Sequence, residues 1–307
     1  VLGQDNCCFA RLSSGWELAC VFDGHGPYGH WPATRAARTL PFFLQEGAGA
    51  ALLREGSIEE ALRFAFEAVE CELEAESVIN NIDLQISGCT AAAALRHAER
   101  DSMWLATAGD SKAALLAPGR GAVEETSDHK PSREDEAERI YRMGGDVKET
   151  QYGDGYIDKR VYFRGACFPG LGVSRSFGDC AVKDIGVCAE PEVVRWSLEG
   201  VDGAYLLICS DGVWEFLTPK EVADCVLGAL AEGRTPQQAV DGLLASSRKA
   251  WREKEDESYC DDITIVLVPL SRGARAPSWD VVAGPEEKST VAKSLADCSG
   301  DGGCTAQ

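Results

Sequence analysis

The chain has 307 residues, of which 45% are hydrophobic and 26% are charged, a composition that is ordinary for a folded protein with a substantial core. Its formal net charge of −20 argues against broad binding to nucleic acid or anionic membranes, because both need a basic surface. No stretch is long and apolar enough to predict a membrane span, and thirteen cysteines without a C-x-x-C pair predict neither a zinc site nor a disulfide framework.

Apolar runs of strand length recur along the chain and predict β-strands. In chain order they cover Trp16–Phe22, Cys89–Leu95, Met103–Thr107, Ala113–Leu116, Tyr205–Cys209 and Ile263–Val268. Three of these runs follow one another within residues 89–116, which leaves no room for the crossover helices that parallel strands would need. We therefore expect antiparallel sheets with helices packed outside them, which is an α+β fold.

Helical periodicity and capping residues predict five helices between and after these strands. They cover residues Trp31–Gln45, Ile58–Ser77, Ser132–Met143, Thr218–Ala231 and Thr235–Trp251. Ser57 and Glu60 have the spacing of a capping box, and Pro41 predicts a kink or an end of the first helix. Thr218 and Thr235 each precede a proline and are expected to be N-caps.

The chain is expected to hold one folded domain over residues 1–270. Residues 144–172 are rich in glycine, charge and aromatic side chains and are predicted to leave the core as a flap. Residues 271–307 have a low-complexity composition and are predicted to be a tail with at most a short helix near Ser289–Ala296. A monomer is expected, and the free thiols indicate an intracellular location in cytoplasm or nucleus.

Four acidic residues stand at the ends of predicted strands, most of them beside a glycine. They are Asp23, Asp110, Asp211 and Asp261. One Asp-Gly pair alone is typical of an ordinary turn. Four such carboxylates spread along the chain are better explained by a shared site, because sheets bring distant strand ends to one edge and clustered carboxylates repel unless a cation neutralises them.

The ligand chemistry of this predicted cluster favours a hard cation. Carboxylate oxygens without a nearby group of Cys or His are typical of Mg²⁺ or Mn²⁺ rather than Zn²⁺. Two such ions a few ångströms apart can hold a phosphoryl group and activate a water molecule. Gly24 follows Asp23 and would leave its carbonyl open to a metal, because no side chain crowds it.

An ordered set of motifs resembles the metal-dependent, type 2C protein serine/threonine phosphatases, with a style closer to plant and protist members. It covers about residues 1–270. The main matching segments are Gln4-Asp5, Phe22-Asp23-Gly24-His25-Gly26, Ser87-Gly88-Cys89-Thr90, Gly109-Asp110-Ser111-Lys112, Asp128-His129-Lys130-Pro131, Ser174-Arg175-Ser176-Phe177-Gly178-Asp179, Ser210-Asp211-Gly212 and Asp261-Asp262-Ile263-Thr264. The segment Phe22-Asp23-Gly24-His25-Gly26 and the order of the whole set make the resemblance specific.

The resemblance implies a central β-sandwich of two antiparallel sheets flanked by α-helices, the four-layer αββα arrangement, with a dinuclear Mg²⁺ or Mn²⁺ site at one end. By position, Asp23 would bridge the two ions, the Gly24 carbonyl would bind one, and Asp211 and Asp261 would bind the other. The further residues it implies are Asp5 behind the ligands, Gln4 near a metal-bound water, and Asp110 and Glu215 for a third, weakly bound ion.

The resemblance also implies an activity, a hydrolase that removes phosphate from phosphoserine and phosphothreonine in proteins. A metal-activated water would attack phosphorus without a phosphoenzyme, and His25 would protonate the leaving oxygen. One alternative is a pseudophosphatase that serves as a binding or scaffold module. Another is a metal-dependent phosphohydrolase that acts on small molecules.

Departures from the family pattern limit these expectations. Glu215 stands where an aspartate is usual, which puts a third metal at that position in doubt. The usual phosphate-binding basic residue would lie upstream of Val1. Asp128 and His129 could suggest an acid–base pair, but neighbours in sequence seldom meet in the required geometry, and we interpret them as structural. Ser174, Arg175 and Asp179 are interpreted as an internal hydrogen-bonding element.

Overall fold

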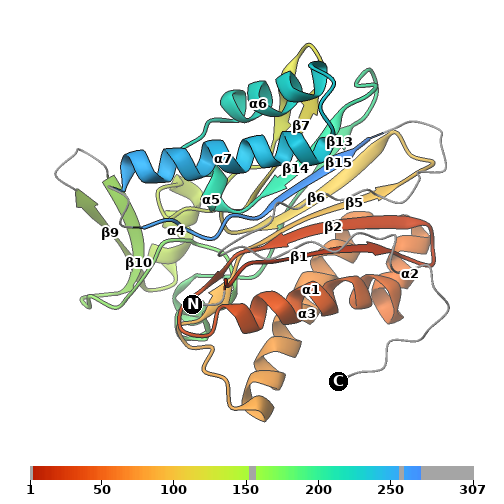
Figure 1. Cartoon of the computed structure of the whole chain (residues 1–307). Coiled ribbons are helices and arrows are strands. Elements are labelled where there is room, and N and C mark those ends of the chain that lie inside the picture. Colours follow the sequence, from red (N-terminus) through yellow and green to blue (C-terminus); the bar gives the residue numbers. More distant parts are fainter. Residues whose placement is uncertain (1–2, 152–156, 256–258, 271–307) are drawn as a thin grey trace.

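Two antiparallel sheets lie face to face at the centre of the computed structural model, which describes residues 3–151, 157–255 and 259–270 (Figure 1). One sheet has the strand order β1-β2-β5-β6-β13 and the other β15-β14-β7-β8. The first comprises β1 (Asn6–Arg11), β2 (Trp16–Phe22), β5 (Ala91–His97), β6 (Ser102–Ala108) and β13 (Glu192–Ser197). The second comprises β7 (Lys112–Ala117), β8 (Gly121–Glu125), β14 (Tyr205–Cys209) and β15 (Ile265–Pro269).

Helices cover the outer faces of both sheets (Figure 1). The five-stranded sheet is covered by α1 (His30–Gln45), α2 (Gly47–Glu55) and α3 (Ile58–Asn80). The four-stranded sheet is covered by α6 (Pro219–Ala231) and α7 (Pro236–Lys254). The predicted α+β sandwich flanked by helices is therefore confirmed, with its sheets antiparallel throughout.

The central strands, such as β2, β6 and β14, are buried on both faces, which explains why they appear in the sequence as continuous apolar runs. In β2, Leu18, Cys20 and Phe22 face the helices, whereas Ala19 and Val21 face the opposite sheet. Alternate side chains of a strand point to opposite faces, so one run of residues supplies two separate cores. Full burial of a side chain such as Phe22 contributes about 1.5–3 kcal/mol to folding.

A small sheet of order β12-β4-β3 fastens three loops at one end of the sandwich. It pairs β3 (Gly24–His25) with β4 (Gly88–Cys89) and β4 with β12 (Phe177–Gly178). The three strands are far apart in the sequence, so this small sheet brings distant segments together. It also carries two of the predicted site residues.

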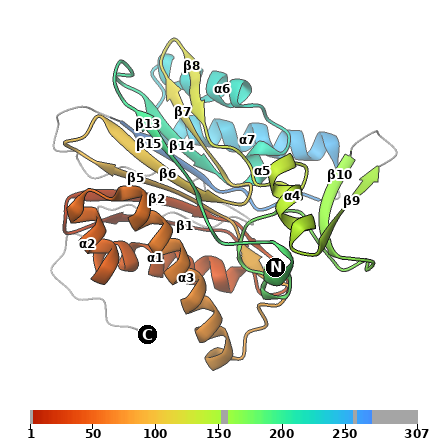
Figure 2. The ribbon, with the colours of Figure 1, turned by 180° about the vertical axis from the view of Figure 1, so that it is seen from behind.

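The predicted excursion over residues 144–172 forms a sheet of its own, with the order β11-β10-β9. Its strands are β9 (Gly145–Gln151), β10 (Ile157–Phe163) and β11 (Pro169–Leu171). Together with α4 (Glu134–Arg142) it stands beside one end of the sandwich, as the reverse view shows (Figure 2). Ile140 of α4 and Val161 of β10 share a small core. Its role as a flap stays a prediction, and residues 152–156 lie outside the described part.

Some local predictions are wrong. Ser57 makes no capping hydrogen bond from its side chain, so the capping box is not formed. Pro41 lies inside α1 and does not end it, since the helix continues to Gln45 as predicted, and a kink at Pro41 stays a prediction. The predicted strand Cys89–Leu95 is interrupted at Thr90, which lies between β4 and β5. The final strand begins at Ile265 rather than Ile263.

Other local predictions are confirmed. Thr218 and Thr235 are N-caps, and each accepts a hydrogen bond from the backbone N–H three residues later. The glutamate and glutamine at those positions complete two capping boxes that the sequence reading had not named. Within the described residues, no helix is both long and apolar enough to cross a membrane. The predicted tail over 271–307, including Ser289–Ala296, lies outside them.

Candidate active site

The strand-end carboxylates lie together at the end of the sandwich that carries the small β12-β4-β3 sheet. Asp23 follows β2 and interacts electrostatically with Asp5, Asp110, Asp211 and Asp261. Side-chain hydrogen bonds join Asp23 to Asp5 and to Asp211. Two carboxyl groups can share a hydrogen bond only if one of them holds a proton, so this cluster is short of positive charge.

The pKa values of these carboxyl groups report the same shortage. Burial, reinforced by the neighbouring carboxylates, raises the pKa of Asp23 well above its usual range. Burial likewise raises the pKa of Asp211 to about 8 and that of Asp5 to about 7. Asp211 Oδ1 is buried without a hydrogen-bond partner among the described residues. An orphaned buried oxygen of this kind is costly, and a cation would satisfy it.

Asp23 and Gly24 are held by their backbone. The Asp23 N–H donates to Thr90 Oγ1 at 3.1 Å, and the Thr90 N–H donates to the Asp23 carbonyl at 2.8 Å. A Cβ on Gly24 would lie 2.4 Å from the Gly29 carbonyl oxygen and 2.5 Å from that of Gln4. Only glycine fits there, so the break in the strand at Thr90 and the glycine together fix where Asp23 points.

The N-terminal segment reaches the C-terminal strand at this site. The Gln4 N–H donates to Asp262 Oδ2 at 2.5 Å, and its side-chain amide donates to the Gly26 carbonyl at 2.8 Å. Thr264 Oγ1 donates to Asp5 Oδ2 at 2.8 Å. Gln4 and Asp5 therefore join the site by binding its other members.

His25 has a partner that the sequence reasoning missed. His25 Nε2 donates to Asp179 Oδ2 at 2.7 Å, and Ser176 Oγ donates to the same oxygen at 2.6 Å. Burial alone would raise the pKa of Asp179, but these contacts outweigh it and lower that pKa. Burial would lower the pKa of His25, whereas Asp179 raises it, and the net shift is upward. The carboxylate thus fixes the ring and favours its protonated form.

No local sequence signal marks Asp179 as the partner of His25. Asp179 follows Gly178 and adopts the left-handed conformation with φ +52°, which is uncommon outside glycine. A Cβ on Gly88 would lie 2.4 Å from Asp179 Oδ2, so the carboxylate packs directly on that glycine. The partner of His25 is 154 positions away, and no periodicity links the two.

A second missed member is Lys130, whose ammonium group contacts Asp110. The same ammonium interacts electrostatically with Asp211 and Glu215. The N–H of Glu215 donates to the Asp211 carbonyl at 2.8 Å, which places its backbone next to the cluster. Asp110 and Glu215, predicted to bind a third ion, therefore face a positive charge supplied by the chain.

The donor chemistry of the cluster fits a hard divalent cation. It offers carboxylate oxygens, a constrained glycine carbonyl and the orphaned oxygen of Asp211, and such oxygens suit Mg²⁺ or Mn²⁺. Across residues 3–151, 157–255 and 259–270, however, no three Asp, Glu, His or Cys side chains stand around one point as metal ligands would. The metal site is therefore a proposal that rests on composition, burial and charge.

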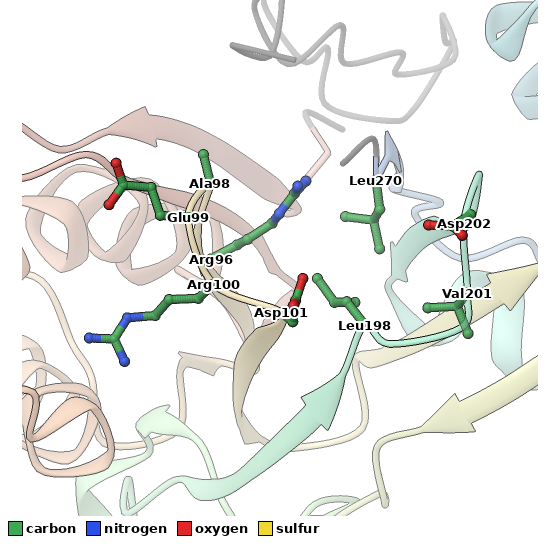
Figure 3. A pocket seen from close by; sticks show the side chains of 9 residues that line it. All are labelled: Arg96, Ala98, Glu99, Arg100, Asp101, Leu198, Val201, Asp202 and Leu270. Atoms are coloured by element: carbon green, nitrogen blue, oxygen red, sulfur yellow. The ribbon is translucent and has the colours of Figure 1, made fainter. Parts of the chain in front are cut away.

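A cavity of about 250 Å³ lies elsewhere, at the opposite end of the sandwich (Figure 3). Arg96, Asp101, Leu198 and Leu270 are among its lining residues. It opens beside the turn that joins β5 to β6, whereas Asp110 follows the other end of β6. Arginines and carboxylates both line it, and it has no contact with the carboxylate cluster.

The family model described as "Protein phosphatase 2C" matches residues 1–254. The chain belongs to this family. The protein phosphatase 2C resemblance predicted from the ordered motifs is thus confirmed. A rice protein (Oryza sativa subsp. japonica) named "Probable protein phosphatase 2C 64" is 34% identical over 260 residues, which are 82% of this chain and 58% of that protein.

Two Arabidopsis thaliana proteins are similar to this phosphatase 2C chain. "Probable protein phosphatase 2C 34" is 32% identical over 275 residues, 84% of this chain and 73% of that protein. "Probable protein phosphatase 2C 52" is 31% identical over 294 residues, 84% of this chain and 60% of that protein. The chain thus spans less than two thirds of the rice protein and of this second Arabidopsis protein.

Solved structures share the phosphatase 2C fold. The crystal structure of a serine-threonine phosphatase 2C from Toxoplasma gondii has a TM-score of 0.69 at 19% identity and covers 87% of this chain and 90% of its own. The structure of a C. elegans sex determining protein has a TM-score of 0.68 at 22% identity, with coverage of 89% and 64%. At these identities the likeness supports the fold alone.

Proposed function

We propose that the chain hydrolyses phosphoserine and phosphothreonine in proteins. The observation that carries this proposal is the buried carboxylate cluster around Asp23, which is short of positive charge and stands at the end of a phosphatase 2C fold. Carboxyl groups with raised pKa values in one buried site are a feature of functional sites rather than of structural ones. The family and its relatives supply the class of reaction.

Asp23, the Gly24 carbonyl, Asp211 and Asp261 are the residues that would hold two Mg²⁺ or Mn²⁺ ions. When bound, the ions would supply an activated water and offset the negative charge of the phosphoryl oxygens, so that attack on phosphorus needs no phosphoenzyme. The chain contributes by fixing these oxygens. Thr90 clamps the Asp23 backbone on both sides, and Asp261 Oδ1 accepts from the Asp262 N–H at 2.9 Å.

His25 supplies the proton for the departing serine or threonine oxygen. An alkoxide is a poor leaving group, so protonation of that oxygen accelerates the step. Asp179 holds the ring through Nε2, which leaves Nδ1 for the substrate. Because Asp179 is buried and ionised, it also stabilises the imidazolium that donates the proton. Asp179 is therefore a positioning residue in this proposal.

The test is phosphate release from a phosphothreonine peptide with Mn²⁺ or Mg²⁺ and then with excess chelator. Wild-type turnover should depend on the metal and should be lost in Asp211→Asn, which removes the carboxylate that carries the orphaned oxygen. Asp224→Asn is the matched control, since Asp224 is exposed and pairs with exposed Lys220 on the surface of α6. This control should retain wild-type turnover.

Two results would contradict the proposal. Metal-dependent turnover that survives Asp211→Asn would move the reaction away from this cluster. A folded wild-type chain without turnover on the peptide would instead favour the pseudophosphatase alternative. A nucleotide substrate run in parallel separates the remaining alternative, because a small-molecule phosphohydrolase would favour the nucleotide over the peptide.

A further inference from the structure

The ammonium group of Lys130 lies among the carboxylates of the candidate site. Its Nζ contacts Asp110 Oδ2, and the two side chains are 35% and 7% exposed. Asp211 and Glu215 add to the attraction on the same ammonium. Lys130 therefore brings a positive charge to one of the predicted metal-binding carboxylates.

The loop that carries Lys130 is pinned to the loop that carries Asp110. The His129 N–H donates to the Gly109 carbonyl at 2.9 Å, and His129 Nδ1 lies 3.2 Å from the same oxygen. On the other side the Ser174 N–H donates to the His129 carbonyl at 2.8 Å. His129 is fully buried, so these bonds hold the backbone at Lys130 next to the loop of Asp110.

The neighbouring lysine does not share this position. Lys112 lies two residues after Asp110, but its Nζ is 3.3 Å from Asp128 Oδ2 and stacks 5.8 Å from the Trp214 ring centre. The two lysines therefore have different tasks. Lys112 neutralises a carboxylate outside the cluster, and Lys130 neutralises one inside it.

We infer that Lys130 is a built-in counter-cation that keeps a third divalent ion away from Asp110 and Glu215. An ammonium group and a divalent ion compete for the same carboxylate oxygens and repel each other at short range. This inference rests on the proposed function, because it concerns the same metal site. It assigns the site two ions rather than three, with the third positive position filled by the chain.

Calorimetric titration with Mn²⁺ tests the inference on the whole chain. Wild type should bind two ions, and so should Lys130→Arg, which keeps the charge. Lys130→Met should bind one more ion, or bind its weakest ion at least about tenfold more tightly, because the competing charge is gone. Lys112→Met, the matched control, removes a positive charge from the adjoining strand and should behave as wild type.

A second variant keeps the inference falsifiable if Lys130→Met does not fold. Asp110→Asn should still bind two Mn²⁺ ions, since Asp110 pairs with Lys130 and not with a metal. Loss of an ion in Asp110→Asn, three ions in wild type, or an unchanged titration in Lys130→Met would each overturn the inference alone. A wild-type chain that binds no Mn²⁺ would overturn the proposed function as well, so the two failures are distinguishable.

Discussion

Glu136 and Asp23 are both buried carboxylates, yet their pKa values move in opposite directions. Burial would raise the pKa of Glu136, but hydrogen bonds from Arg139, Arg175 and Ser174 lower it far below its usual range. Around Asp23, burial and further carboxylates act in the same direction and raise the pKa. The Glu136 region is a completed ion network, whereas the Asp23 region holds more negative than positive charge, which the proposed cations would balance.

The difference shows why burial of charge alone does not identify a functional site. Arg139 donates to both oxygens of Glu136 at 2.6 Å, and Arg175 Nη2 donates at 2.7 Å. These bonds tie α4 to the segment after Ser174, which leads to the histidine-binding Asp179. The network thus supports the site from outside it. The orphaned oxygen of Asp211 has no such partners among the described residues.

The largest expected effect is on stability, from Glu136→Gln. The substitution leaves the guanidinium groups of Arg139 and Arg175, which are 18% and 14% exposed, without their buried counter-charge. Breaking a buried ion pair costs about 3–5 kcal/mol, and this loss should be near the lower end because both arginines keep some contact with water. Thermal and urea denaturation should show this loss. A variant as stable as wild type would mean that the network is not the completed ion pair described above.

The next effect is on catalysis, from Asp179→Asn. Without the carboxylate, His25 loses its orientation, and kcat on the phosphothreonine peptide should fall by about 10²-fold or more. KM and the melting temperature should change little. The kcat of the variant on an aryl phosphate should fall much less, because the leaving group of that substrate hardly needs a proton. Equal losses on both substrates would contradict the positioning role.

Acid sensitivity should appear in the Glu136 region. Burial and then Arg175 lower the pKa of His129 to about 4, so between about pH 6.5 and 4 the unfolded chain binds more protons than the folded one. The contribution of His129 to stability is therefore full above about pH 6.5 and falls, by about 3 kcal/mol, as the pH drops toward 4. Below the unfolded pKa of Glu136, protonation of that group adds a further loss.

The variant His129→Gln isolates this contribution. Urea denaturation from pH 7 to 4.5 should show that wild type loses stability relative to the variant as the pH drops. The raised pKa values of Asp5, Asp23 and Asp211 act in both proteins, so the difference between the two curves reports His129. A difference that does not change with pH would contradict the buried neutral histidine.

The smallest expected effect comes from Arg133→Gln. Arg133 Nη2 donates to Glu192 Oε2 at 2.8 Å, the guanidinium also pairs with Asp135, and Nη2 lies 3.5 Å from Glu136 Oε1 at the edge of the Glu136 network. Its side chain is 26% exposed, so water screens these pairs and the stability loss should stay below about 1 kcal/mol. Denaturation of this variant and of Glu136→Gln under the same conditions measures the contrast, and equal losses would contradict the screening of Arg133.

The sequence was sufficient for elements whose pattern is local. The strands Trp16–Phe22 and Tyr205–Cys209 have the predicted bounds. A strand that is buried on both faces is a continuous apolar run, which can be recognised in the sequence without knowledge of the tertiary structure. The predicted Ser57 capping box was wrong, because the motif shows only that a hydrogen bond could form, and the Ser57 side chain does not form it. β1 was missed because its residues are only half-buried and carry no continuous apolar run.

The residues of the candidate site could be predicted from the sequence only in part, for the same reason. Asp23, Asp110, Asp211 and Asp261 each carry a local sign, a carboxylate at a strand end. Asp179 and Lys130 act through partners that lie 154 and 20 positions away, and those pairings depend on how loops meet in space. Contacts of that kind follow from the tertiary structure and leave no spacing for a sequence to show.

The most direct measurement is an anomalous diffraction map from crystals soaked with Mn²⁺. Two strong peaks are expected within coordination distance of Asp23, one of them also near the Gly24 carbonyl and the other near Asp211 and Asp261. No third peak is expected at Asp110, where Lys130 supplies the charge. A map without peaks beside Asp23 would contradict the claim that this uncompensated cluster is the metal site.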